Sequence, residues 1–125
     1  MKLLIIEDDI STVESIKFCL ELYEPNSTLL YTNKGLEAIK MLNNDRFDAV
    51  IIDVGLPDID GIDVLHQLRQ FSATPAIVLS AKHSNEVISK ALEYGANDYI
   101  TKPFNYKKLL LRLREFVNRP SQQLS

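Results

Sequence analysis

Short apolar runs alternate along this chain with longer segments of helical periodicity. Within these runs polar residues are rare, and the second run is the weakest. The runs are Leu3–Ile6, Leu29–Tyr31, Ala49–Ile52, Ala76–Leu79 and Tyr99–Ile100. Because polar and apolar residues do not alternate within them, they predict strands that are covered on both faces, as in a parallel sheet.

A helix-period segment follows each apolar run. In the first of these segments Ser11 and Glu14 have the spacing of a capping box, and Pro25 predicts the end of the helix. In the fourth, Gly95 is a candidate C-terminal cap. The chain therefore consists of five predicted β-α units.

Five such units predict an α/β, flavodoxin-like (βα)5 fold. We expect a five-stranded parallel sheet in the order 2-1-3-4-5, with helices on both faces. The length of 125 residues suits one domain. We assign residues 1–119 to that domain and residues 120–125, with their linker composition, to a linker or tail. In such sheets ligands bind outside the carboxyl ends of the strands, at the switch point in strand order.

Composition and charge argue against several classes of function. A formal net charge of -3 and a pI near 5.3 give no basic face for nucleic acid, so DNA contact would need a separate output domain. The single cysteine, Cys19, excludes an intramolecular disulfide and a cysteine-based zinc site. The apolar run Leu3–Ile6 is too short for a signal peptide or a membrane span. We expect a cytoplasmic protein that does not bind membranes.

Polar residues cluster where the predicted strands end. Glu7 and Asp8 follow the first strand, Asp53 the third and Ser80 the fourth, and Lys102 lies just beyond the fifth. In the order 2-1-3-4-5 the first and third strands are neighbours. The carboxylates of Glu7, Asp8 and Asp53 are therefore expected to converge at the switch point.

Three neighbouring carboxylates repel one another unless a cation lies between them. Hard oxygen ligands suit Mg²⁺ or Mn²⁺, and Mg²⁺ commonly shares its coordination sites with phosphate. Lys102 could supply positive charge and Ser80 a hydroxyl donor for a phosphoryl oxygen. A carboxylate such as Asp53 is a competent phosphoryl nucleophile. The cluster predicts phosphoryl chemistry.

Each of these residues also has an ordinary structural explanation. Acids that follow a strand often cap the next helix, Lys-Pro is a common turn element, and Ser80 could cap a loop. Asp53 alone could be a loop residue. A functional site is favoured because all of them lie at the same end of the predicted sheet.

These residues resemble the receiver domains of two-component response regulators. The resemblance covers about residues 2 to 119. The matching stretches are Leu4–Asp9, Asp53–Gly61, Val78–Ala81 and Gly95–Phe104. In combination these motifs are highly specific, although each alone is weak.

The resemblance implies a phosphoacceptor site. Asp53 corresponds to the aspartate that receives a phosphoryl group from a sensor histidine kinase. Glu7 and Asp8 correspond to the acid pair that holds Mg²⁺, with Asp8 the more direct ligand, and the Gly55 carbonyl corresponds to a further ligand. Such a domain is a regulatory phosphoacceptor and not an enzyme, apart from self-catalysed phosphotransfer and dephosphorylation.

The resemblance also implies a switch. Ser80 corresponds to the hydroxyl that turns toward the phosphoryl group, and Tyr99 to the aromatic residue that moves inward as Ser80 leaves its resting place. Lys102 corresponds to the lysine that contacts phosphate, and its bond to Pro103 is typically cis in the family. A local change of charge thereby biases a bistable surface.

The sequence is most similar to the receivers of winged-helix transcription factors. In that subgroup phosphorylation favours a symmetric homodimer. Ile88 and Lys108 stand where a basic and an acidic residue are usual, so one ion pair of that dimer is missing. Asp98 and Arg112 could still pair. The candidate dimer face is therefore formed by Ile88, Asp98 and Arg112.

Four other functions were compared with this sequence pattern. A phosphatase of the haloacid-dehalogenase class needs a second aspartate where this chain has Gly55. A stand-alone receiver, or an unphosphorylated receiver-like module, could serve in protein interaction. A flavin-binding flavodoxin would need a Ser/Thr/Gly-rich phosphate loop after the first strand, where this chain has acids.

Overall fold

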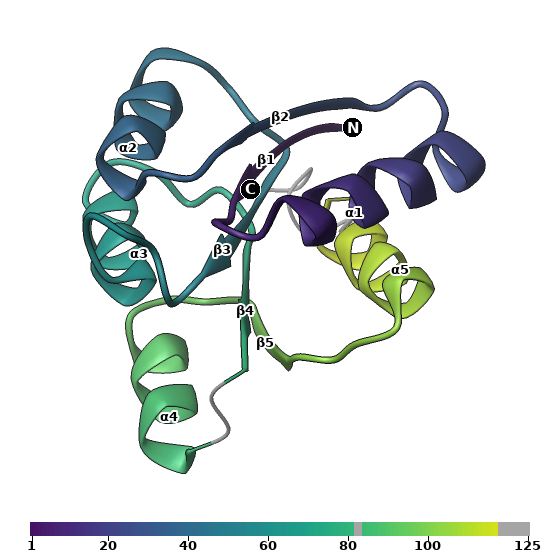
Figure 1. Ribbon diagram of the computed structural model, residues 1–125. Coiled ribbons are helices and arrows are strands. Elements are labelled where there is room, and N and C mark those ends of the chain that lie inside the picture. Colours follow the sequence, from purple (N-terminus) through teal and green to yellow (C-terminus); the bar gives the residue numbers. More distant parts are fainter. Residues whose placement is uncertain (82–83, 118–125) are drawn as a thin grey trace.

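The computed structural model describes residues 1–81 and 84–117. Residues 120–125, which we predict to be a linker or tail, lie outside the described residues. Strands and helices alternate strictly along the chain (Figure 1). In order they are β1 (Lys2–Ile6), α1 (Ile10–Tyr23), β2 (Thr28–Thr32), α2 (Gly35–Asn44), β3 (Ala49–Asp53), α3 (Gly61–Leu68), β4 (Ala76–Ser80), α4 (Asn85–Glu93), β5 (Asp98–Thr101) and α5 (Tyr106–Val117).

The strands form one parallel sheet in the order β2-β1-β3-β4-β5, which confirms the predicted α/β topology. β1 lies between β2 and β3, so Ile6 is opposite Thr32 on one side and Ile52 on the other. The carboxyl ends of β1 and β3 therefore lie side by side at the same edge of the sheet. This is the switch point at which the sequence predicted the site.

Helices cover both faces of the sheet, as predicted. Figure 1 shows α1 and α5 on one side, and α2, α3 and α4 on the other. Alternate residues of β1 enter the two cores: Leu3 and Ile5 pack with α1 and α5, whereas Leu4 and Ile6 pack with the other three helices. All four side chains are fully buried. Burial of each such side chain stabilises the fold by roughly 1.5–3 kcal/mol.

β2 departs from the prediction that every strand is covered on both faces. Leu30 is 38% exposed and Tyr31 is 53% exposed. β2 lies at the edge of the sheet beside β1, so its side chains are less covered than those of the central strands. The apolar run that predicted β2 was also the weakest of the five.

The helix ends agree with the sequence except at the start of α1. There the N-cap is Asp9, whose Oδ1 accepts hydrogen bonds from the backbone N–H and hydroxyl of Ser11 at 3.0 and 2.7 Å. The prediction that Ser11 is the N-cap was therefore wrong by two residues. The helix ends before Pro25, as expected, and Gly95 follows α4 with a φ of 103°, a conformation that favours glycine.

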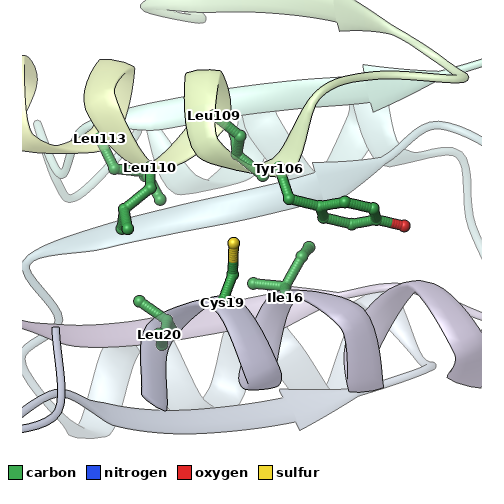
Figure 2. A pocket seen from close by; sticks show the side chains of 7 residues that line it. All are labelled: Ile16, Cys19, Leu20, Tyr106, Leu109, Leu110 and Leu113. Carbon is green, nitrogen blue, oxygen red and sulfur yellow. The ribbon is translucent and has the colours of Figure 1, made fainter. Parts of the chain in front are cut away.

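α1 and α5 pack against each other over the same face of the sheet. Cys19 lies on α1 with its sulfur directed toward α5, at a small gap between the two helices (Figure 2). The gap is lined by Ile16, Cys19, Leu20, Tyr106, Leu109, Leu110 and Leu113. Among the described residues, no helix has the length and apolar character needed to cross a membrane.

Candidate phosphoacceptor site

The ends of β1 and β3 bring two acidic side chains together. Glu7 directly follows β1, and Asp53 is the last residue of β3. Glu7 is buried, at 2% exposed, whereas the Asp53 side chain retains 14% exposure. Asp53 is therefore the more accessible carboxylate, at the edge where the sequence predicted the nucleophile.

Lys102 lies between these two carboxylates. Its Nζ donates to Glu7 Oε1 and lies 3.6 Å from Asp53 Oδ1. The Lys102 backbone N–H donates to the Ser80 carbonyl at 2.8 Å, which fixes the end of β5 against the end of β4. The Lys102-Pro103 peptide bond is cis, as the resemblance implied. Four strand ends thus contribute to one polar cluster.

Burial and charge shift the pKa values within this cluster. Burial, together with a hydrogen bond to Asp53, raises the pKa of Glu7 to about 7, although Lys102 acts in the opposite direction. Burial alone would lower the pKa of Lys102. The hydrogen bond to Glu7 and the negative charge of Asp53 outweigh burial and raise that pKa above its ordinary value. Lys102 is therefore a permanent cation at neutral pH.

The loop between β3 and α3 lies directly against Asp53. A Cβ added at Gly61 would stand 2.1 Å from the Asp53 carbonyl oxygen, so only glycine fits there. The Gly61 N–H donates to the Val54 carbonyl at 2.9 Å. Gly55 is exposed, and a Cβ there would meet only Asp53 Oδ2, at 3.9 Å. The approach to the Asp53 carboxylate is therefore open on the Gly55 side.

The two carboxylates suit a magnesium ion. Glu7 Oε2 is buried, and the described residues offer it no hydrogen-bond partner. Mg²⁺ commonly uses only one or two protein carboxylates, with water and phosphate as its other ligands. Within the described residues no group of three His, Cys, Asp or Glu side chains is arranged to hold a metal. Asp8 is exposed, and its role as a ligand remains a prediction.

The two switch candidates lie on adjacent strands. Ser80 ends β4 and is 3% exposed. Tyr99 lies on β5 opposite Val78, is half-buried and packs against the core shared with α3 and α4. β4 also pairs with β3, which ends at Asp53. The movement of Ser80 and Tyr99 remains a prediction.

The candidate dimer face contains an ion pair that forms within one chain. Arg112 Nε lies 2.8 Å from Asp98 Oδ2, and Arg112 Nη1 lies 2.6 Å from Glu115 Oε2. The Arg112 guanidinium also stacks over the Phe116 ring, 4.9 Å from its centroid. Ile88 is half-buried on α4. The dimer itself remains a prediction.

Sequence reasoning missed one residue of this region. The sequence analysis assigned no functional role to Asp58, which lies in the loop after Asp53. Its carboxylate accepts hydrogen bonds from the backbone N–H groups of Gly35 and Leu36, at 2.8 and 2.9 Å. No local signal could reveal this, because the partners are 22 and 23 residues away in the sequence.

A comparison with protein-family models decides the family. The model for the response regulator receiver domain matches residues 3–114. The chain belongs to the response regulator receiver domain family. The receiver is 39% identical over 113 residues to the transcriptional regulatory protein KdpE of Staphylococcus aureus, a match that covers 90% of this chain and 48% of KdpE. It spans about half the length of the curated relatives it matches.

Solved structures agree with the assignment to this family. The receiver domain of the Francisella response regulator 1452 superposes with a TM-score of 0.87 at 34% identity, covering 94% of this chain and 97% of that one. The receiver domain of the sensor histidine kinase PA1611 from Pseudomonas aeruginosa superposes with a TM-score of 0.82 at 25% identity, covering 93% and 96%. The latter structure has a magnesium ion coordinated in its active-site cleft.

Proposed function

We propose that this receiver accepts a phosphoryl group on Asp53 from a sensor histidine kinase and acts as a signalling switch. One observation carries the proposal: the partly exposed Asp53 carboxylate lies 3.6 Å from the ammonium group of Lys102. A nucleophile and a cation for the transferred group are therefore adjacent at the switch point of the sheet. The family assignment supports the same role.

Asp53 would act as the nucleophile. One of its carboxylate oxygens attacks the phosphorus of a phosphohistidine, an O–P bond forms and the N–P bond breaks. The electron pair of the broken bond stays on the imidazole nitrogen of the donor, which then takes up a proton. Lys102 Nζ is placed to stabilise negative charge on a phosphoryl oxygen, and the Ser80 hydroxyl could donate to another.

Glu7, Asp8, Asp53 and the carbonyl of Gly55 would hold Mg²⁺. When bound, the ion neutralises charge between the carboxylates and the phosphoryl oxygens. The buried and unpartnered Glu7 Oε2 supports this assignment, as does the magnesium ion in the related PA1611 receiver. The pairing of β1 with β3 also supports it, because Glu7 follows β1 and Asp53 ends β3.

The output is proposed to be transcriptional. Relatives such as KdpE are transcriptional regulatory proteins about twice as long as this chain. We propose that residues 1–119 form the receiver, that residues 120–125 begin a linker, and that a separate domain contacts DNA. Ser80 and Tyr99 would transmit the phosphorylation state of Asp53 to the surface of the domain. Phosphorylation would then favour a homodimer in the cytoplasm through Ile88, Asp98 and Arg112.

Two rival functions differ in their chemistry. A haloacid-dehalogenase-type phosphatase would need a proton-transferring side chain at position 55, but Gly55 has none. An unphosphorylated interaction module would not need the pairing of Lys102 with Glu7 and Asp53. The arrangement of these three residues therefore favours the phosphoacceptor.

Incubation with acetyl phosphate tests the proposal without a known kinase. With Mg²⁺ present, intact mass spectrometry should show the addition of one phosphoryl group. Chelation of the metal should prevent that addition, and inorganic phosphate should accumulate no faster than the phosphorylated protein decays. An unmodified chain would support the interaction module, and rapid multiple turnover would support the phosphatase.

A further inference from the structure

Asp58 ties the loop after the phosphoacceptor to a distant helix. Oδ1 accepts from the Gly35 N–H at 2.8 Å and Oδ2 from the Leu36 N–H at 2.9 Å. These are the first two amides of α2, whose own N-cap residue, Lys34, makes no side-chain cap bond. The helix thus receives its cap from a residue on another loop, and both oxygens of that carboxylate are used.

The contact between α2 and this loop is closely packed. Gly35 is buried, and a Cβ added there would lie 2.6 Å from Val64 Cγ2 and 2.7 Å from Ile59 Cγ1. Ile59 follows Asp58 directly, and Val64 lies on α3. The start of α2 therefore fits against both the loop and the helix that follows it.

The same loop carries the open approach to Asp53. It is closed at its base by the hydrogen bond from Gly61 N–H to the Val54 carbonyl, at 2.9 Å. At the other end, Asp58 fastens it to α2. Gly55 lies between these two attachments, exposed and beside Asp53 Oδ2. On the side of Val54 it is also spanned by a hydrogen bond from the Leu56 N–H to the Val54 carbonyl, at 3.1 Å. Without the Asp58 attachment, this exposed segment would lose its attachment on the other side.

We infer that Asp58 is a positioning residue of the phosphoacceptor site, which holds the β3–α3 loop against α2 and so fixes the Gly55 carbonyl beside Asp53. This inference rests on the proposed function, because it assigns the Gly55 carbonyl to the metal. Asp58 touches neither the metal nor the phosphoryl group. Its loss should weaken metal binding by allowing the loop to sample positions in which the Gly55 carbonyl points elsewhere.

Asp58→Ala and Asp58→Asn test the inference. Metal binding is measured by electron paramagnetic resonance of free Mn²⁺ during titration, and amide hydrogen exchange is measured on the metal-free protein. We expect Asp58→Ala to raise the Mn²⁺ dissociation constant roughly threefold to tenfold. Exchange should accelerate at Gly35, Leu36 and Gly55. Asp58→Asn, which keeps an acceptor oxygen, should show a smaller effect on both readouts.

Asp48→Ala is the matched control. Asp48 also accepts a hydrogen bond from a distant backbone N–H, that of Lys2 at 2.7 Å, but it precedes β3 at the opposite end of the sheet. This variant should bind Mn²⁺ as the wild type does. Equal Mn²⁺ affinity of Asp58→Ala and wild type, with faster exchange at Leu36, would overturn the inference, as would an equal loss of affinity in Asp48→Ala. A wild-type chain that neither binds Mn²⁺ nor accepts a phosphoryl group would overturn the proposed function itself.

Discussion

Lys102 Nζ lies 3.6 Å from Asp53 Oδ1 although the two residues are 49 positions apart in the chain. The same ammonium group pairs with the buried carboxylate of Glu7. Lys102 is thereby held by one carboxylate while it faces the other. Little rearrangement is needed for it to contact a group that arrives at Asp53, because the cation is already in place.

Replacement of Lys102 tests this arrangement. Lys102→Met keeps most of the side-chain length but removes the charge that would stabilise the transferred phosphoryl group. We expect phosphorylation by acetyl phosphate to slow by roughly 10²-fold. Lys2→Met is the control, since Lys2 forms an ion pair with Asp45 at a distance from this site. Similar rates for both variants, measured by intact mass against time, would remove Lys102 from the mechanism.

The close approach of Gly61 to Asp53 predicts a difference between two glycines of one loop. Gly61→Ala places a Cβ against the Asp53 carbonyl and should lower the free energy of unfolding by about 1–3 kcal/mol. Gly55→Ala has room for its methyl group and should change stability much less. Urea denaturation measures both. A Gly55→Ala variant as destabilised as Gly61→Ala would show that the packing described at Asp53 is wrong.

The Asp58 carboxylate predicts a pH dependence of stability. The backbone hydrogen bond from Leu36, the largest cause, lowers the pKa of Asp58 below its ordinary value of 3.8. The unfolded chain therefore binds this proton more readily than the folded one, and ionised Asp58 stabilises the fold. That contribution is present above pH 3.8 and is lost as the pH falls through the lower folded-state pKa.

Asp58→Asn makes this contribution measurable. The difference in unfolding free energy between wild type and Asp58→Asn should be constant near neutral pH and should shrink below 3.8, where the wild-type carboxyl also becomes neutral. Urea denaturation at a series of pH values gives both curves. A difference that grows toward low pH would contradict the hydrogen bonds assigned to Asp58.

The pairing of Asp98 with Arg112 within one chain predicts a weak dimer. An intermolecular ion pair would have to compete with this bond and with Glu115 for the same guanidinium. The expected Ile88–Lys108 mismatch removes a further contact. In sedimentation velocity with beryllofluoride, association should appear only at high protein concentration. A tight dimer without the phosphoryl mimic would contradict this.

The fold was predictable because its signals are local and repeated. Buried strands such as β3 and β4 consist of uninterrupted apolar residues, and parallel β-α units leave few topologies to choose from. The convergence of Glu7, Asp53 and Lys102 followed from that topology, because parallel strands end at one edge. The exposed side chains of β2 were missed because cover on both faces was predicted for every apolar run alike, although the predicted strand order already put the second strand at an edge.

Details set by tertiary packing were not predictable. Asp58 caps a helix more than twenty residues away, and no periodicity links it to Gly35. In the same way, the prediction that Ser11 caps the first helix was wrong: Asp9 caps it, and both residue types are good N-caps, so local sequence does not decide between them. The predicted topology brings Glu7, Asp53 and Lys102 to one edge of the sheet, and long-range hydrogen bonds such as that of Asp58 are set by tertiary packing.

The identity of the phosphorylated residue is the most direct test of the central claim. After treatment with acetyl phosphate and Mg²⁺, borohydride reduction converts an aspartyl phosphate to homoserine, which peptide mass spectrometry locates in the sequence. The account predicts homoserine at position 53 alone, and no modification in Asp53→Ala. Homoserine at another aspartate of the wild-type chain, or equal phosphorylation of Asp53→Ala, would contradict it.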